Sequence, residues 1–136
     1  MGNTKSLGIA YTDQDIVGSD QIYSGGELGY TAAAQGTVTQ ATDKSTAVTL
    51  NKSAGRITMN AASLGATTNV SFTLNNSYIS SNDILILTIS GGATVAAYNV
   101  WVNSMSAGSA SITLRNTTAG ALAEAVIINF ALIHCV

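Results

Sequence analysis

The side chains of this sequence that could do chemistry are few and poorly placed to act together. His134 and Cys135 are its single histidine and single cysteine. Neighbouring side chains of a strand point to opposite faces, so these two cannot form a nucleophile–base pair with each other. No second histidine is present to build a metal site. We therefore interpret both as terminal packing or interface positions.

The carboxylates give the same result. Asp83 and Glu124 are the only ones after residue 43. A glycosidase needs two carboxylates, but each of these stands at the start of an expected strand, where a charge is ordinary. An ion pair between Glu124 and Arg115 is the favoured interpretation. Asp13 and Asp15 faintly resemble a calcium loop that lacks its final glutamate. The sequence thus predicts no catalytic residue, no metal site and no cofactor.

Charge is scarce throughout. Only 9% of residues are charged, against about 25% in an average soluble domain. Residues 57–136 hold just Asp83, Arg115 and Glu124. This favours a body packed against other proteins; a neutral monomer rich in Thr and Ser is the alternative. The net charge of −2 comes without a basic run, which argues against nucleic-acid binding. No apolar run long enough for a membrane span is present, and a lone cysteine fits a reducing cytoplasm.

Residues 1–36 differ from the rest of the sequence. Their apolar residues follow neither a helical nor a strand period, which predicts an extended arm. Among the anchors spaced along it we expect Ile9, Tyr11, Tyr23 and Tyr30 to dock on a partner surface, because tyrosine is common at protein interfaces.

Residues 37–136 are predicted to form a β-sandwich domain, jelly-roll-like in its arrangement. Alternating apolar and polar residues recur in short segments separated by turn-forming Gly, Asn and Ser. Eight such segments at this spacing are typical of a sandwich or jelly roll. The expected strands are 38–40, 47–50, 56–59, 69–74, 84–90, 96–104, 110–116 and 124–134. A single helical turn is expected at 60–65.

The last strand is apolar on both of its faces, whereas a strand with one wet face should alternate. It therefore needs cover on both sides, and a second copy of the chain is the expected cover. The proposed homotrimer contact consists of one face of the strand and its polar interruption: Val126, Ile128, Asn129, Phe130 and Leu132. The Asn129 amide needs partners when buried, which three copies around an axis would supply to each other.

A resemblance covers about three-quarters of the chain. The segments GTVTQATDKSTAVTLN (36–51), GRITMNAASL (55–64), VSFTLNNSYISSNDILIL (70–87), SGGATVAAYNVWV (90–102) and AGSASITLRNTTAGALAEAVIINFALI (107–133) together resemble a small structural module of tailed bacteriophages, including cyanophages. The resemblance implies a trimeric β-sandwich of the kind used in capsid cement (decoration) proteins and virion fibre proteins, without catalytic residues. The arm matches only loosely, through LGIAYTDQD (7–15).

Together these observations predict a structural virion protein rather than an enzyme. We expect a capsid cement protein, made in the host cytoplasm, that binds the major capsid protein on the head surface as a homotrimer. The alternative is a tail-fibre, spike or head-fibre module that binds a host receptor or glycan through Trp101 or Tyr98. Core packing is the favoured role of Trp101. A hydrolase using Asp83 or Glu124 is a distant third.

Overall fold

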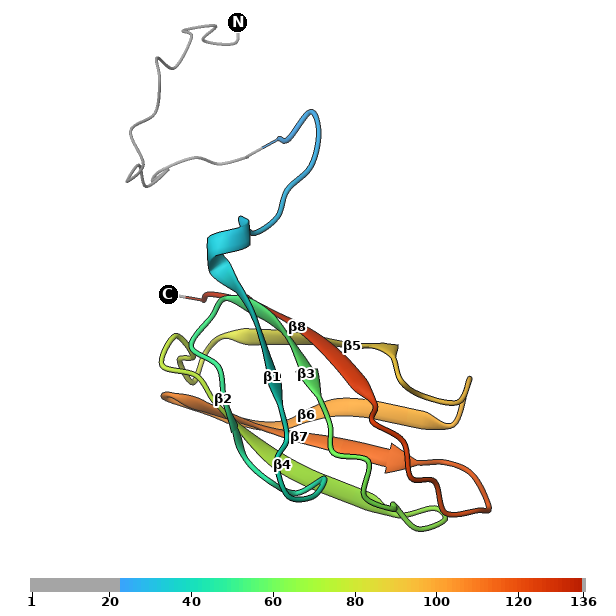
Figure 1. The fold of residues 1–136 in the computed structure, drawn as a ribbon. Helices are drawn as coiled ribbons and strands as arrows, with labels where there is room; N and C mark the ends of the chain where they lie inside the picture. Colours follow the sequence, from blue (N-terminus) through green and yellow to red (C-terminus); the bar gives the residue numbers. More distant parts are fainter. Residues whose placement is uncertain (1–22, 136) are drawn as a thin grey trace, which may run out of the picture.

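The computed structural model describes residues 23–135 of the chain (Figure 1). A 3-10 helix η1 (Ala32–Ala34) precedes the first strand. Eight strands follow: β1 (Gln35–Thr39), β2 (Val48–Thr49), β3 (Ala54–Thr58), β4 (Asn69–Asn75), β5 (Ile84–Gly91), β6 (Tyr98–Ser106), β7 (Ser109–Asn116) and β8 (Ile127–Ile133). Each overlaps one of the strand segments expected from the sequence. Among the described residues, no helix has the length and apolar character needed to cross a membrane.

Two local expectations need correction. The first strand starts at Gln35, slightly before the expected start of the domain at residue 37. Residues 60–65 form no helical turn; Leu64 instead makes an isolated antiparallel bridge with Leu122. Burial explains this second difference, because the bridge holds Leu64 in the core, where it is 7% exposed.

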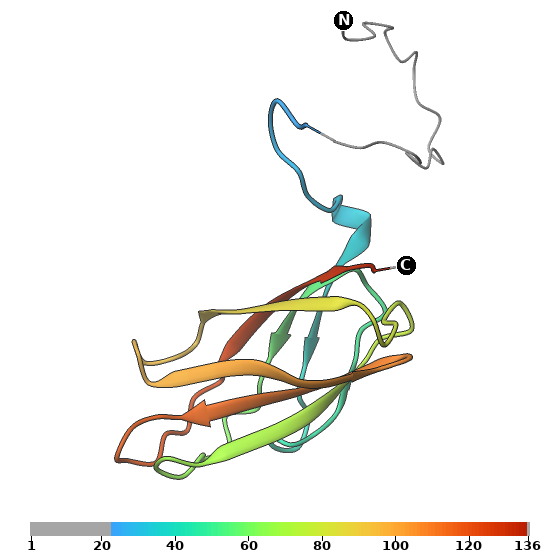
Figure 2. The same cartoon turned by 180° about the vertical axis from the view of Figure 1, so that it is seen from behind.

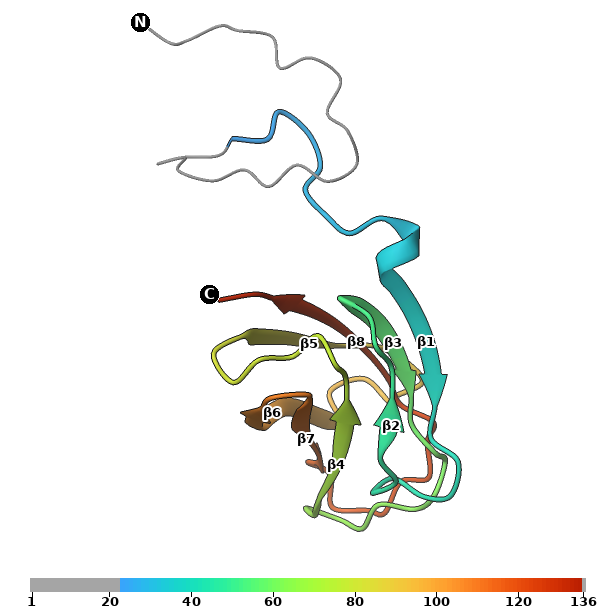
Figure 3. The ribbon, with the colours of Figure 1, turned by 90° about the vertical axis from the view of Figure 1, so that its left-hand side faces the viewer.

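The strands form two four-stranded sheets that lie face to face (Figures 1 and 3). Sheet 1 has the order β1-β3-β8-β5, and sheet 2 has the order β2-β4-β7-β6. In each sheet the first two strands are parallel and the remaining pairs are antiparallel. β5 of sheet 1 and β6 of sheet 2 are neighbours at one side of the sandwich (Figure 2). The structure therefore shows the expected β-sandwich, built from mixed sheets; it shows neither a jelly-roll topology nor a trimer.

The core lies between the sheets and follows directly from the alternation of residues along each strand. Inward-facing side chains of both sheets join in one hydrophobic cluster between them. The least exposed apolar core residues, at 0–1%, are Ile57, Met59, Leu74, Ala97, Ala110, Ile112, Leu114, Val126, Ile128 and Leu132. Among the described residues the buried charged side chains are Lys44 and Asp83, and both are hydrogen-bonded.

Two paired glycines let the Leu50 side chain pack tightly against sheet 1. Gly36 and Gly55 are partners in the β1–β3 register. A Cβ atom on Gly55 would lie 2.6 Å from Leu50 Cδ2 and 2.9 Å from both the Gly36 oxygen and Phe130 Cε1. These distances are shorter than van der Waals contact, so the sequence needs glycine here.

We expect Gly55→Ala to lower the free energy of unfolding by about 2 kcal/mol, because overpacking a core forces its neighbours to shift. Urea unfolding followed by circular dichroism measures this. Gly120→Ala is the matched control, since no atom lies within 4 Å of a Cβ there. Equal stability of the two variants would contradict the packing argument.

Candidate functional site

The two faces of β8 have different surroundings. Val126, Ile128, Phe130 and Leu132 point into the core of their own chain and are 0–4% exposed. This corrects the expectation that they form a trimer contact, because buried side chains cannot also meet another copy. The opposite face, with Ile127, Asn129, Ala131 and Ile133, forms part of the outer surface of sheet 1.

An apolar strip lies on that outer surface where β8 pairs with β5. It consists of Ile84, Ile86, Ala131 and Ile133, with Ile84 opposite Ile133 and Ile86 opposite Ala131. The three isoleucines are 47–54% exposed. Neighbouring exposed isoleucines on a strand pair are unusual for a wet surface and mark an interaction site.

Sequence reasoning recognised β8 as apolar on both faces but assigned the contact to the inner face, so it named no residue of this strip. A signal for the β5 part was present in the sequence, because β5 begins ILIL and is apolar on both faces over these four residues. The predicted trimer contact was placed on β8 alone, because a sequence does not show which strands pair. The structure places the two doubly apolar strands side by side.

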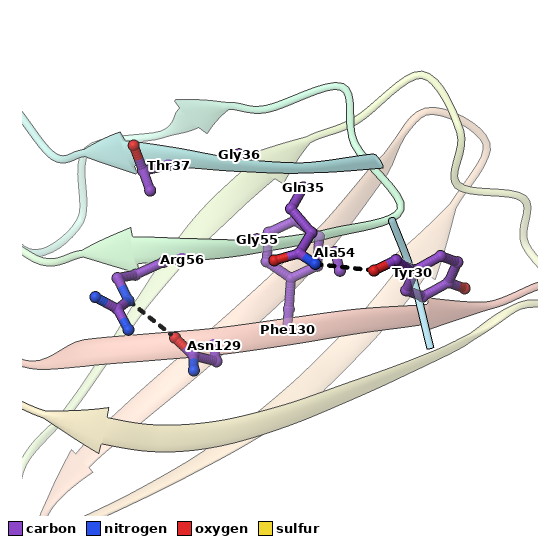
Figure 4. Close-up of a pocket in the computed structure, with 9 residues that line it drawn as sticks. All are labelled: Tyr30, Gln35, Gly36, Thr37, Ala54, Gly55, Arg56, Asn129 and Phe130. Carbon is purple, nitrogen blue, oxygen red and sulfur yellow. Dashed lines mark hydrogen bonds between the residues drawn. The ribbon is translucent and has the colours of Figure 1, made fainter. Parts of the chain in front are cut away.

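A hollow of about 490 Å³ lies next to the strip on the same face of sheet 1 (Figure 4). Its floor is thin, because Gly36, Ala54 and Gly55 carry little or no side chain and the Phe130 ring lies beneath them. Its polar rim contains Gln35, Thr37, Arg56 and Asn129, and Tyr30 closes one end. Such a surface suits a contact in which an apolar group is held by a polar border.

Asn129 lies in the outer face between the strip and the rest of the sheet. Its Oδ1 accepts hydrogen bonds from Ser90 Oγ at 3.0 Å and from Arg56 Nε at 3.3 Å. The chain itself therefore supplies partners for this amide, and no second copy is needed for that purpose. The same bond to Arg56 fixes the one charged side chain on this face.

The arm meets the body at Tyr30. The Tyr30 hydroxyl donates a hydrogen bond to the Leu132 carbonyl, and Gln35 Nε2 donates to the Tyr30 carbonyl at 2.9 Å. Beyond this point the side chains are well exposed, with Leu28 at 91% and Tyr23 at 85%. The predicted anchors Ile9 and Tyr11 lie outside the described residues. Tyr30 thus fixes the base of the arm to its own body.

The outer face of sheet 2 is polar by contrast. Its outward positions alternate with the core residues and are almost all Ser, Thr or Asn. Trp101 lies among them and is 37% exposed, so its expected role in core packing is wrong. Tyr98 points inward and is 7% exposed. Burial, together with the neighbouring Glu124 carboxylate, raises the pKa of Tyr98 to about 12.

Glu124 and Lys44 hold loops together at one end of the sandwich. Glu124 accepts hydrogen bonds from Thr94 Oγ1 at 2.7 Å and from the Thr94 N–H at 3.1 Å, and these bonds lower its pKa. The predicted pair with Arg115 is therefore not formed. Lys44, 3% exposed, donates to the carbonyls of Asn60 at 2.6 Å and Glu124 at 2.5 Å. Burial lowers the pKa of Lys44, while the charge of Glu124 opposes that shift. These contacts connect three loops.

Asp83 holds the end of the chain. Its Oδ1 accepts the Cys135 N–H at 3.0 Å, its Oδ2 lies 2.9 Å from His134 Nδ1, and Ser80 Oγ donates to it at 2.7 Å. Burial raises the pKa of Asp83, but the hydrogen bonds from Ser80, Cys135 and His134 outweigh burial and hold it far below its usual value. His134 and Cys135 thus both bond to Asp83, and the His134 side chain is 57% exposed instead of packed into the core.

Within residues 23–135, no group of three or more His, Cys, Asp or Glu side chains is placed to hold a metal ion. Comparisons with protein families, with curated proteins and with solved structures found no match to this chain. The outer face of sheet 1 brings together the apolar strip, the hollow and the base of the arm.

Proposed function

We propose that this chain is a capsid cement protein of a tailed bacteriophage, a non-catalytic homotrimer that binds the outer head shell and stabilises contacts between capsid subunits. Its partners are then the major capsid protein and further copies of itself. The phage context and the number three come from the sequence resemblance. The proposal is supported by one structural observation in particular, the unequal outer faces of the sandwich.

The two faces differ in a way that suits a protein bound on one side. The apolar strip, the hollow and the base of the arm all belong to sheet 1, and residues 23–34 rise from that side (Figures 1 and 3). The face of sheet 2 points the opposite way and is polar. Burying isoleucine surface contributes about 25 cal/mol per Å², so covering the strip with other copies favours assembly.

In this proposal the arm provides the contact with the shell. Ile9, Tyr11 and Tyr23 reach the capsid protein, while Tyr30 fixes the direction in which the arm leaves. Three arms per trimer then act together, and multivalency turns weak single contacts into stable attachment.

Mass and location test the proposal first. Light scattering on the purified full chain should give three times the chain mass of 13.8 kDa. Electron microscopy with a gold-labelled antibody should place the chain on phage heads. A stable monomer, or label confined to tails, would reject the cement function.

Removing residues 1–22 should abolish binding to heads and leave the trimer intact, because that deletion retains Tyr30 and every described strand. Co-sedimentation of the shortened chain with heads that lack this protein measures attachment, and light scattering measures the trimer. The full chain is the control. Attachment that survives the deletion would show that Ile9 and Tyr11 are not needed to bind the shell.

A further inference from the structure

Trp101 occupies an exposed position that neither packing nor the proposed function explains. It is the only tryptophan of the chain and sits on the outer face of sheet 2, opposite Thr113 of β7. Thr113 in turn is opposite Ser71 of β4, and these two hydroxyls are 2.7 Å apart. These two hydroxyls bond to each other and Thr113 is 4% exposed, whereas Trp101 itself is 37% exposed.

Arg115 lies one row away on the same face. It is opposite Asn99 of β6, the residue two positions before Trp101 on its strand. Diagonal neighbours of this kind lie within reach of each other's long side chains. Arg115 is the only charged side chain on the outer face of sheet 2, and no acidic group among the described residues forms an ion pair with it. The guanidinium is therefore available to an external anion.

This combination matches the chemistry of an acidic sugar. The indole offers a flat apolar surface to the C–H face of a pyranose ring. The exposed side-chain amides of Asn99 and Asn103 can hydrogen-bond to sugar hydroxyls. A guanidinium binds a carboxylate through two parallel hydrogen bonds. We propose that the Trp101–Arg115 face binds a uronic-acid residue of an acidic polysaccharide.

Because this face belongs to sheet 2, it can bind a sugar while sheet 1 is covered by a partner. Sheet 2 lies on the opposite side of the sandwich from the arm and the apolar strip (Figure 1). Covering sheet 1 therefore leaves Trp101 and Arg115 open to solution. The inference does not rest on the cement function, because it requires only the exposed face of one chain.

The single tryptophan provides a direct measurement, since its fluorescence reports on this site alone. The full chain is titrated with oligogalacturonate and, separately, with malto-oligosaccharide of equal length as the neutral probe. We expect oligogalacturonate to change the Trp101 emission in a saturable manner. It should also bind about tenfold more tightly than the neutral sugar, because one charge-assisted hydrogen bond contributes about that factor to affinity.

Two arginine variants separate this site from general charge attraction. Arg115→Gln should weaken oligogalacturonate binding about tenfold and leave binding of the neutral sugar unchanged. Arg56→Gln, the matched change on the outer face of sheet 1, should leave both unchanged. Trp101→Ala, followed by calorimetry, should abolish binding while the circular dichroism spectrum is retained. Unchanged emission, equal affinity for the two sugars, or equal loss in both arginine variants would overturn the proposal.

Discussion

Asn116→Ala should lower the free energy of unfolding by about 3 kcal/mol, a larger effect than most single substitutions produce. Asn116 is fully buried. Its Nδ2 donates to the carbonyls of Leu64 and Gly65 at 3.0 Å and of Gly120 at 2.8 Å. Its Oδ1 accepts from the N–H of Thr118 at 2.9 Å. Alanine would remove these hydrogen bonds, each worth about 1 kcal/mol, and would leave a cavity where the fully buried amide stands.

Urea unfolding followed by circular dichroism measures this loss. Asn69→Ala is a suitable control, because Asn69 is exposed at the start of β4 and should change stability by less than about 0.5 kcal/mol. Because Asn116 joins the loop after β3 to the loop after β7, its loss should loosen both sheets together. A variant as stable as the control would show that water replaces the amide.

Ile86→Asp should dissociate the proposed trimer, weakening association at least about 100-fold, while each chain stays folded. Ile86 is one of the three exposed isoleucines of the apolar strip and is 47% exposed in a single chain. A carboxylate is therefore tolerated in the separate chain. In the proposed trimer, three such carboxylates would be buried without a partner, at a cost of several kcal/mol.

Sedimentation equilibrium over a range of concentrations measures the dissociation, and circular dichroism confirms the fold. Asn75→Asp adds the same charge on the outer face of sheet 2 and should leave the trimer unchanged. A trimer that persists in Ile86→Asp would mean that copies meet through another surface. In that case the strip becomes the candidate site for the capsid protein.

Local patterns predicted the strands well, because alternation records which side of a strand meets the core. The segment 110–116, for example, alternates Ala, Ile and Leu with polar residues, and β7 follows it closely. The sequence also identified β8 as apolar on both faces. It could not tell which face is internal, since either set of side chains would fill a core equally well.

The sequence by itself determined the class of fold, the positions of the strands and the shortage of catalytic groups, all of which depend on residue type and short spacing. Only the tertiary structure decided the sites. Strand pairing brings Ile84 and Ile86 beside Ile133, and Arg115 beside Trp101. The packing of two loops likewise brings Glu124 to Thr94 and not to Arg115. Pairing joins residues far apart in the chain, and no local pattern carries that information.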